Sequence, residues 1–369
     1  MRLLIISDID SIHTQRWVSS LSRRGHTIFL FGLLRGDASL YDNLANVTVF
    51  SCGFRLDNLS RLQQWIYGKA QYLKAVSILK EKIRQFQPDI LHAHYASSYG
   101  LIGALANFHP YVISVWGSDV YQYPRAGLIY KNLLTFSLKR ADTILSTSHC
   151  MAAETHKYTA KPIAVTPFGV NTTLFSPSSQ PHDPSAPFTI GCVKTLSPTY
   201  GIDTLIQAFA RLCQLAPDTP LRLLIAGKGP QEQQLRALAD SLHISDRVEF
   251  LGFLPNKELP ALYRQFDIAC YLSRSESFGV AAIEAMACQC PVVASNADGF
   301  KEVVADNTTG LIVPREAPEA AAHALLRLLT DRDLRRSMAT AARDRVLQLY
   351  DWERNVDTME QVYRQVLGK

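Results

Sequence analysis

The chain has 369 residues, which at roughly 100–200 residues per domain suggests two or three domains, and its formal net charge at pH 7 is +5. Hydrophobic residues make up 47% and charged residues 19%, a balance that excludes a disordered chain, a collagen-like repeat and a mucin-like stalk. Residues 1–180 hold 18 basic and 10 acidic side chains, a net of +8, whereas the remainder holds 20 and 23, a net of −3. This contrast favours two domains with different partners.

The cysteines and the apolar runs indicate the cellular compartment of the protein. The seven cysteines form no C-x-x-C pair, which is typical of unpaired thiols in a reducing cytosol. The first apolar run, Leu3–Ile6, is shorter than the core of a secretory signal, and Asp8 follows it closely. The uncharged stretch 90–118 is interrupted by histidines and Pro110, so it does not predict a membrane span. We therefore expect a cytoplasmic protein.

The first half of the chain alternates short apolar strands with helices. A buried strand over Arg2–Ser7 is followed by a helix over Thr14–Arg24, which Gly25 ends. Six further strands are expected at Thr27–Phe31, Asn46–Phe50, Asp89–Ala93, Tyr111–Val115, Thr143–Ser146 and Ile163–Thr166. This alternation predicts parallel β-α-β units, because parallel strands need helical crossovers.

A segment rich in Pro and Ser over residues 176–187 predicts a linker, after which the alternation resumes. Strands are expected at Phe188–Val193, Leu221–Ala226, Arg247–Leu251, Asp267–Leu272, Pro291–Ala294 and Leu311–Val313. Helices are expected between them, as at Ile202–Leu215 and Gln231–Leu242, and a last helix is expected over Trp352–Leu367.

These elements predict an α/β protein of two Rossmann-like, doubly wound parallel-sheet domains that face each other across a cleft. The first domain is expected over residues 1–178 and the second over residues 188–350. Residues 351–369 form a C-terminal helix with one apolar face, which we expect to pack back toward the first domain. Ligands of such sheets bind outside the carboxyl ends of the strands, so the chemistry is sought there.

The most informative segment runs from Glu276 to Ala287, between a predicted strand and a predicted helix. It carries two carboxylates, Glu276 and Glu284, and a glycine at 279 that lets a ligand approach the backbone. The amides of residues 278–280 would point outward at a helix N-terminus and form an anion site. A nucleotide diphosphate suits this site, with Glu284 reaching a ribose hydroxyl and Glu276 a sugar hydroxyl. The alternative is an ordinary helix cap with a surface glutamate.

The two acids and the seven residues between them resemble the E-x7-E motif of the family-four retaining glycosyltransferases, which have the GT-B fold of two Rossmann-like domains. Further stretches are similar to the family in the same order, namely Phe168-Gly169-Val170-Asn171, Ala226-Gly227-Lys228-Gly229-Pro230, Phe250-Leu251-Gly252-Phe253-Leu254, Cys290–Ser295 and Thr309–Pro314. The resemblance extends over nearly the whole chain and is most specific over residues 190–314.

The resemblance implies a nucleotide-diphosphate sugar as donor, carried by UDP or GDP and held mainly by the second domain. Glu276 would hold sugar hydroxyls, and Lys194 would hold the diphosphate. The donor-binding residues would be Glu284, Ser277, Phe278, Gly279, Val280, Gly227, Gly252, Phe253, Leu254 and Tyr200. The family usually has an Arg and a Lys before the glycine that aligns with Gly201. Here Lys194 lies seven residues before that glycine and Tyr200 immediately before it, so one cation is missing; Lys228 and Lys301 are no established substitutes.

The first domain departs from the family pattern in two places. His13 lies where many relatives have paired glycines, and it is a candidate contact for the acceptor or the diphosphate; the alternative is a polar residue at a helix start. The stretch Trp116-Gly117-Ser118-Asp119 replaces H-G-x-D, so Trp116 offers a carbonyl to the sugar but no imidazole. His94 is a candidate to supply that imidazole, the alternative being a buried structural histidine. Asp119 is a candidate partner of the acceptor hydroxyl.

Several other patterns in the sequence suggest other ligands. Asp8-Ile9-Asp10 spells D-x-D but lies in the first domain, and His92 and His94, two apart on a strand, are expected on opposite faces, so no metal site is predicted. Residues 54–85 form a basic helix with interleaved aromatics, which suits an anionic membrane surface or else a solvated face. No nucleic-acid-binding motif is present, and no cofactor is expected.

The sequence therefore predicts a cytoplasmic, metal-independent, retaining glycosyltransferase of the hexosyltransferase type. It would act in polysaccharide biosynthesis, on a hydroxyl of a glycan or of a lipid-linked sugar at the inner membrane face. Retention implies front-face attack assisted by the leaving phosphate oxygen. The alternatives are a nucleotide-sugar epimerase on the same fold and a non-catalytic sugar-nucleotide-binding scaffold. A dinucleotide oxidoreductase is disfavoured because residues 8–14 lack G-x-G-x-x-G.

Overall fold

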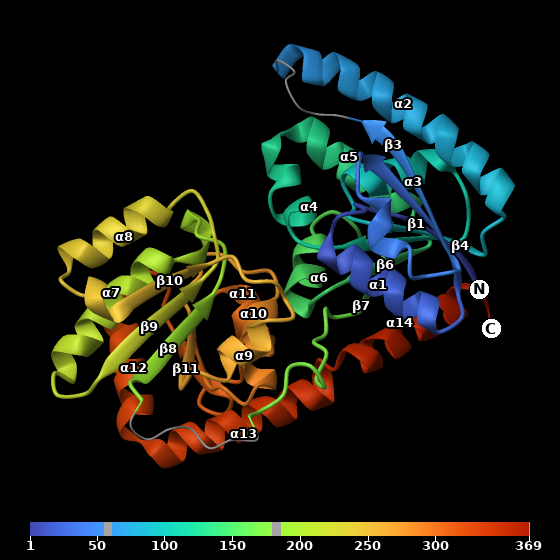
Figure 1. Cartoon of the computed structure of the whole chain (residues 1–369). Coiled ribbons are helices and arrows are strands. Elements are labelled where there is room, and N and C mark those ends of the chain that lie inside the picture. The colour runs from blue at the N-terminus through green and yellow to red at the C-terminus, as the bar shows by residue number, and fades with distance from the viewer. Residues whose placement is uncertain (55–60, 179–185, 369) are drawn as a thin grey trace. The chain divides into compact units, whose positions relative to one another are not determined.

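The computed structural model describes residues 1–54, 61–178 and 186–368, with the side chains of residues 61–70 excepted. The chain divides into two compact units (Figure 1). Unit 1 consists of Met1–Pro167 together with Val356–Lys369, and unit 2 consists of Phe168–Asn355. Unit 1 is therefore discontinuous in sequence, and unit 2 begins before the Pro- and Ser-rich segment rather than after it.

Unit 1 is built on a parallel sheet of seven described strands in the order β3-β2-β1-β4-β5-β6-β7. The strands are β1 (Arg2–Ile6), β2 (Thr27–Leu34), β3 (Val47–Phe54), β4 (Ile90–His94), β5 (Tyr111–Val115), β6 (Thr143–Ser146) and β7 (Ile163–Val165). The helices are α1 (Ile12–Arg23), α2 (Arg61–Phe86), α3 (Ser98–Ala106), α4 (Ser118–Tyr121), α5 (Leu128–Arg140) and α6 (His149–Thr155), with 3-10 turns at Ala38–Tyr41 and Tyr123–Ala126.

Unit 2 holds a parallel sheet of six described strands in the order β10-β9-β8-β11-β12-β13. The strands are β8 (Phe188–Val193), β9 (Leu221–Ala226), β10 (Val248–Gly252), β11 (Ile268–Tyr271), β12 (Val292–Ser295) and β13 (Gly310–Val313). The helices are α7 (Ile202–Leu215), α8 (Glu232–Ser241), α9 (Leu259–Tyr263), α10 (Val280–Ala287), α11 (Asp298–Val303), α12 (Pro318–Thr330) and α13 (Arg332–Leu349), with 3-10 turns at Pro198–Tyr200 and Ser245–Arg247.

The central strands have the continuous apolar sequence that a sheet covered on both faces requires. Every residue of β4, β5, β11 and β12 is buried, and in β1 only Arg2 is exposed. Helices connect successive parallel strands and supply the second layer of the core, as Leu205 and Phe209 of α7 do in unit 2. The predicted pair of doubly wound parallel sheets is confirmed.

Segment 168–178 belongs to unit 2 because its backbone is bonded there. The amide of Val170 donates to the Tyr350 carbonyl at 2.8 Å, and the amide of Trp352 donates to the Val170 carbonyl at 2.9 Å. The Arg343 guanidinium donates to the carbonyls of Thr172 and Phe175. A side chain on Gly169 would collide with backbone atoms of Trp352 and Tyr350 at 2.8 Å.

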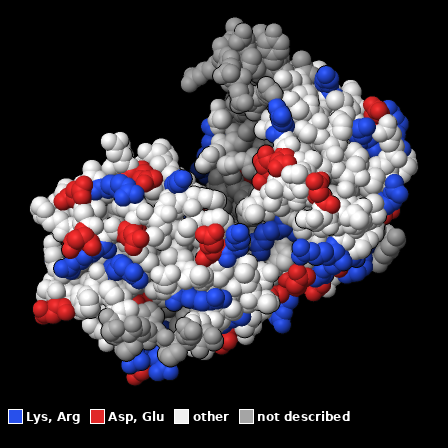
Figure 2. Space-filling model, in the orientation of Figure 1, with Lys and Arg blue, Asp and Glu red and all other residues white. Residues whose placement is uncertain are grey.

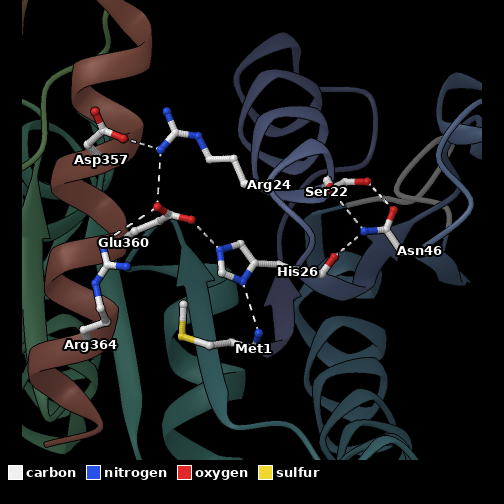
Figure 3. A network of polar contacts seen from close by, with 8 residues as sticks. All are labelled: Met1, Ser22, Arg24, His26, Asn46, Asp357, Glu360 and Arg364. Carbon is white, nitrogen blue, oxygen red and sulfur yellow. Dashed lines mark hydrogen bonds and ion pairs between the residues drawn. The ribbon is translucent and has the colours of Figure 1, made fainter. Parts of the chain in front are cut away.

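The last helix, α14 (Trp352–Val366), begins in unit 2, and from Val356 onward its residues belong to unit 1. Figure 3 shows the polar contacts that it makes with the beginning of the chain. Glu360 accepts hydrogen bonds from the His26 ring, with Nε2 and Oε1 2.6 Å apart, and from Arg24, whose guanidinium also contacts Asp357. The amino terminus of Met1 lies 3.3 Å from the other ring nitrogen of His26.

The surface charge of unit 2 and the apolar character of the helices also bear on the environment of the protein. On the face of unit 2 in Figure 2, acidic and basic side chains alternate, in keeping with the nearly balanced charge of the second half of the chain. Among the described residues, no helix combines the length and the apolar character needed to cross a membrane.

Candidate active site

The sheet of unit 2 reverses its strand order at β8, which pairs with β9 on one side and with β11 on the other. Ligands of doubly wound sheets bind at the carboxyl ends of the strands on either side of such a switch point. Lys194 directly follows β8, and Glu276 lies in the loop between β11 and α10. Their Nζ and Oε2 atoms are 2.5 Å apart, and the two side chains are only 12% and 10% exposed. The sequence placed these residues 82 positions apart, and the fold joins them at the switch point.

The surroundings of Lys194 keep its ammonium group charged. Burial alone would lower the pKa of Lys194, but the Glu276 carboxylate more than offsets this effect, and the pKa lies above its ordinary value. The ammonium nitrogen also lies 4.7 Å from the centre of the Tyr200 ring. Tyr200, which takes the place of a cation in the family pattern, therefore forms one wall of the lysine site. A charged lysine with one exchangeable carboxylate partner is equipped to bind a phosphate.

The turn that leads from Glu276 into α10 is held against α11. Gly279 has φ +107°, and a side chain there would meet the Phe300 ring at 2.9 Å. The amide of Gly299 donates to the Glu276 carbonyl at 3.0 Å, and a side chain on Gly299 would collide with the Phe278 amide nitrogen at 2.5 Å. Residues Ser277, Phe278, Gly279 and Val280 thus form a fixed turn at the N-terminus of α10. Phe278 is itself 3% exposed and anchors the turn in the core.

Glu284 lies in α10 with its carboxylate oriented by two donors. The Tyr263 hydroxyl donates to Oε2 at 3.0 Å, and the Asn256 side-chain amide donates to Oε1 at 3.3 Å. The residue is 5% exposed. These donors fix the direction of the carboxylate oxygens, each of which accepts more than one hydrogen bond.

Glycines bring the neighbouring strand ends together. Gly227 has φ +143°, and a side chain there would lie 1.9 Å from the Lys194 carbonyl oxygen. Its amide donates to the Gly252 carbonyl at 2.7 Å, which ties the end of β9 to the end of β10. Just beyond this contact, Phe253 is 68% exposed and Leu254 is half-buried. An exposed aromatic ring at a strand end is a suitable platform for a nucleobase.

Sequence reasoning missed Arg274, which organises the other side of the lysine site. Its guanidinium donates to both carboxylate oxygens of Asp203, at 2.6 and 3.0 Å, and to Glu316 at 2.8 Å. It also donates to the Pro198 carbonyl at 2.6 Å, and its own amide donates to the Thr199 carbonyl at 2.8 Å. These bonds fix the turn that carries Tyr200. The only signal in the sequence was an arginine between a strand and the E-x7-E segment.

In unit 1, three of the predicted residues form an aromatic group at the ends of β4 and β5. His94 lies against the indole of Trp116 with ring centres 4.6 Å apart, and His13 meets the same indole edge-on at 5.8 Å. Burial, and to a lesser degree Arg16, lowers the pKa of His13 to about 4. Burial also holds the pKa of His94 well below its ordinary value, so both imidazoles are neutral at pH 7.

Asp119 is buried between two loops of unit 1. The residue is 0% exposed, and its carboxylate accepts hydrogen bonds from the backbone amides of Ala96 at 2.8 Å, Gly117 at 2.7 Å and Trp116 at 3.2 Å. These bonds tie the loop after β4 to the loop after β5 and thereby position Trp116. The expected contact of Asp119 with an acceptor hydroxyl stays a prediction.

His92 and His94 lie on the same face of β4, with ring centres 4.6 Å apart. The expectation of opposite faces was wrong, because side chains of a strand alternate and residues two apart share a face. His92 is engaged on both ring nitrogens, by the Tyr363 hydroxyl at 2.7 Å and the Ser114 hydroxyl at 2.8 Å. Asp10 likewise accepts from the Asp37 amide at 2.8 Å. No group of three or more potential metal ligands occurs among the described side chains.

The predicted basic helix over residues 54–85 is seen only in part. Arg55, Arg61, Trp65 and Lys69 lie outside the described residues or side chains. In the described part of α2, Ala75 and Leu79 are buried, whereas Leu73 is 67% exposed and Lys74 is also exposed. One face of this part of the helix therefore packs in unit 1.

The sequence is similar to two glycosyltransferase families, one for each half of the chain. Residues 178–345 match the family described as "Glycosyl transferases group 1", and residues 2–148 match the family described as "Glycosyl transferase 4-like".

Individual relatives extend this similarity. The D-inositol 3-phosphate glycosyltransferase of Kribbella flavida is 31% identical over 75% of this chain and 71% of its own length. The N-acetyl-alpha-D-glucosaminyl L-malate synthase of Bacillus anthracis is 27% identical over 82% of both proteins. The D-inositol 3-phosphate glycosyltransferase of Corynebacterium urealyticum is 39% identical, but over only 47% of this chain and 42% of that protein.

Solved structures share the fold over the full length. Sucrose-phosphate synthase from Thermosynechococcus elongatus superposes with a TM-score of 0.82 at 22% identity and covers 100% of this chain and 99% of its own. HepE from Anabaena, in complex with UDP and glucose, superposes with a TM-score of 0.79 at 19% identity and covers 99% and 100% of the two chains. The two-sheet architecture is therefore the GT-B fold of glycosyltransferases.

Proposed function

The chain belongs to the group 1 glycosyltransferases of the GT-B fold, and from this premise we propose that it transfers a hexose-type sugar, with retention, from a nucleoside-diphosphate sugar to a hydroxyl group. The observation that carries the proposal is the buried Lys194–Glu276 pair at the β8/β11 switch point, 2.5 Å between Nζ and Oε2. One partner suits the diphosphate of a donor, and the other suits the hydroxyls of its sugar. The HepE complexes with UDP and with UDP-glucose support UDP as the carrier.

The roles of the residues follow from their chemistry. On donor binding, the ammonium of Lys194 exchanges Glu276 for the diphosphate, and the amides of the turn at residues 278–280 add dipoles at the start of α10. The freed carboxylate of Glu276 then accepts hydrogen bonds from sugar hydroxyls. Glu284, oriented by Tyr263 and Asn256, accepts from the ribose. The exposed ring of Phe253 stacks on the base.

In the transfer, the bond between the anomeric carbon and the phosphate oxygen breaks and the acceptor oxygen forms the new bond to that carbon. The nucleoside diphosphate leaves with the bonding electron pair, and the acceptor proton passes to its phosphate oxygen on the same face. Negative charge grows on the diphosphate, where Lys194 and the amides are already oriented. Because these groups neutralise the charge, we propose that the reaction needs no metal ion.

The acceptor side is proposed for unit 1, with His13, His94 and Trp116 near the acceptor or the sugar. A glycan or a lipid-linked sugar, as used in polysaccharide assembly, is the proposed acceptor. Peripheral contact of residues 54–85 with an anionic membrane accords with the exposed Leu73 and Lys74 of α2. Co-sedimentation with vesicles of anionic against neutral lipid measures this contact, and equal sedimentation with both would contradict it.

The donor is identified by thermal unfolding with UDP, GDP, ADP and dTDP, and then with the sugars of the best diphosphate. A ligand that binds only the folded state raises the unfolding temperature, and at a fixed concentration a tighter ligand raises it more, roughly with the logarithm of its affinity. Hydrolysis of the stabilising sugar nucleotide, followed by NMR of the anomeric proton in a transfer product, then tests turnover and retention. If no nucleoside diphosphate stabilises the protein, the proposal fails.

Variants of Lys194 and Glu276 distinguish the roles of these two residues. We expect Lys194→Met to weaken UDP binding, and Glu276→Gln to leave UDP binding within a few-fold but to lower sugar turnover by about 10²–10³-fold, as for the loss of one oriented transition-state contact. Lys301→Met is the control, because Lys301 is 53% exposed and its ion-pair partner among the described residues is Asp298 of its own helix. Equal turnover in Glu276→Gln and Lys301→Met would contradict the role of Glu276, whereas UDP binding without turnover in the wild type would favour a binding scaffold.

A further inference from the structure

The sheet of unit 1 has its own switch point, between β1 and β4, and a pocket lies there. The pocket has a volume of about 310 Å³ and is lined by residues at the carboxyl ends of β1, β2, β4 and β5 and by residues of α2 and α3. This volume lies at the lower end of the range for small-molecule sites, which suits one ring-sized ligand. All of its described lining residues belong to unit 1.

One buried polar atom in the pocket wall lacks a partner. His94 lines the pocket and is 1% exposed, and its Nδ1 atom makes no hydrogen bond to any described residue. An unsatisfied buried polar atom costs about 1–3 kcal/mol, so its presence in a pocket wall indicates a ligand or water partner. Because this imidazole is neutral, one ring nitrogen donates and the other accepts a hydrogen bond.

The rest of the wall is aromatic and carries one charge. Tyr72, Tyr95, Tyr99 and Trp116 line the pocket, and Asp8 is the sole charged residue among its described lining residues. Aromatic faces carry negative partial charge. An anionic ligand would therefore face a carboxylate and four such rings with no described cation in the wall to neutralise it.

The backbone of the pocket is built for this arrangement. Tyr95 has φ +79°, a conformation that costs a non-glycine residue of order 1–3 kcal/mol. The amide of Tyr95 donates to the Ser114 carbonyl at 2.9 Å, and its hydroxyl is bonded to the Ser118 hydroxyl. Asp119, through Ala96 and Trp116, ties the same two loops together. The surrounding contacts thus hold the aromatic wall in a strained but defined position.

We propose that this pocket binds the acceptor of the transfer reaction as an uncharged sugar or polyol ring. Asp8 accepts hydrogen bonds from its hydroxyls, Nδ1 of His94 bonds to a further hydroxyl, and the aromatic rings contact its C–H faces. The term acceptor rests on the proposed function; the selection of neutral over anionic rings does not. The relatives named above for inositol 3-phosphate and L-malate act on molecules that carry negative charge, so this chain would differ from them in acceptor class.

The test is saturation-transfer NMR on the full chain in the presence of UDP. The neutral probes are methyl glucoside, methyl mannoside, methyl rhamnoside and myo-inositol, and the anionic probes are glucose 6-phosphate, mannose 6-phosphate, glucuronate and inositol 1-phosphate. We expect at least one neutral probe to bind roughly tenfold more tightly than its charged counterpart, as one uncompensated charge requires. The proposal is overturned if the anionic probes bind as tightly or more tightly, or if no neutral probe binds.

Two neighbouring acids provide matched variants, since both are exposed and lie in the same loop. We expect Asp8→Asn to reduce the discrimination against anionic probes, and Asp8→Lys to reverse it. Asp10→Asn should leave it unchanged, because Asp10 does not line the pocket. If Asp8→Lys binds phosphorylated probes no better than Asp10→Asn does, the proposal is overturned. UDP binding measured in the same samples reports on unit 2, so a failure of the donor proposal is seen separately.

Discussion

Gly201 follows the turn that carries Tyr200. Both its backbone conformation and its closeness to a strand end require a residue without a side chain. Its φ is +61°, and a Cβ atom there would lie 2.0 Å from the Leu272 carbonyl oxygen at the end of β11. We expect Gly201→Ala to lower the unfolding temperature and to weaken UDP binding, because the turn must move away from the strand end. Gly53→Ala is the matched control, since Gly53 has φ +68° and nothing within 4 Å of its Cβ position.

Both substitutions carry the left-handed backbone penalty of about 1–2 kcal/mol, so their difference isolates the steric clash. Thermal unfolding and a UDP titration of the two variants measure it. Equal losses in both would mean that the strand end yields to the new methyl group, and that Tyr200 is not held by this contact.

The two acidic partners of Arg274 differ in how deeply they are buried. Asp203 is 31% exposed and accepts two of its hydrogen bonds, whereas Glu316 is 64% exposed and accepts one. Partial burial alone would raise the pKa of Asp203, but the Arg274 hydrogen bond overrides it and the pKa lies below its ordinary value. The pair therefore stabilises the fold at neutral pH and loses this contribution as the carboxylate is protonated on acidification.

We expect Asp203→Asn to lower the free energy of unfolding by about 1 kcal/mol, and Glu316→Gln to change it by less than about 0.5 kcal/mol. Urea unfolding at pH 7 measures both values. A larger loss in Glu316→Gln would show that the exposed pair, rather than the two-pronged one, holds the Pro198–Tyr200 turn.

At the scale of secondary-structure elements, the buried imidazole of His92 connects a helix and two strands. His92 in β4 is bonded to Tyr363 in α14 and to Ser114 in β5. Burial lowers the pKa of His92 from 6.5 to about 3, so the folded protein keeps this ring neutral while the unfolded chain takes up a proton below pH 6.5. Stability is therefore complete above pH 6.5 and is lost as the pH falls from there toward 3.

We expect the wild-type protein to lose about 2 kcal/mol more than His92→Gln when the pH is lowered from 7 to 5, at about 1.4 kcal/mol per pH unit for one imidazole. Urea unfolding of unit 1 at the two pH values provides the measurement. Tyr363→Phe, which removes a partner but no titrating group, should retain the wild-type slope. Identical slopes in the wild type and His92→Gln would refute this assignment.

The sequence predicted the strands well because parallel sheets bury both faces, so their strands are continuous apolar runs. The run at Leu3–Ile6 and the runs at β4 and β8 are examples. It also predicted that Glu276 and Glu284 flank a helix start, since that relation is local. It did not predict the partners of Glu276, because residues 82 positions apart are joined only by the sheet order.

Other features of the site depended on geometry that no local pattern encodes. Arg274 was missed because its partners come from three different loops. The donors around Asp119 were not predicted, because a motif does not reveal which groups surround a carboxylate, and here they are backbone amides. The position of His92 and His94 on one face could have been predicted from the sequence, because side chains in a strand repeat their direction every two residues.

At the scale of the whole molecule, unit 1 is completed by the last residues of the chain. In α14, Val356 and Tyr363 are 0% exposed, Met359 is 2% exposed and Val362 is 7% exposed. Glu360 adds an ion pair with Arg24 and a hydrogen bond with the His26 ring (Figure 3). The apolar face of residues 351–369 led us to expect that this helix packs toward the first domain, although its residues follow the whole of the second unit in sequence.

A chain that ends at Asn355 should therefore lose the folded state of unit 1 and keep that of unit 2. Each buried apolar side chain of α14 contributes about 1.5–3 kcal/mol, so four of them together match the 5–15 kcal/mol that stabilises a typical domain. Calorimetry should show one remaining transition, which UDP still raises because Lys194, Glu276 and Glu284 all lie in unit 2. A chain that ends at Leu367 should behave as the full chain does. If the shorter chain kept both transitions, α14 would be an appendage of unit 1 and not part of its core.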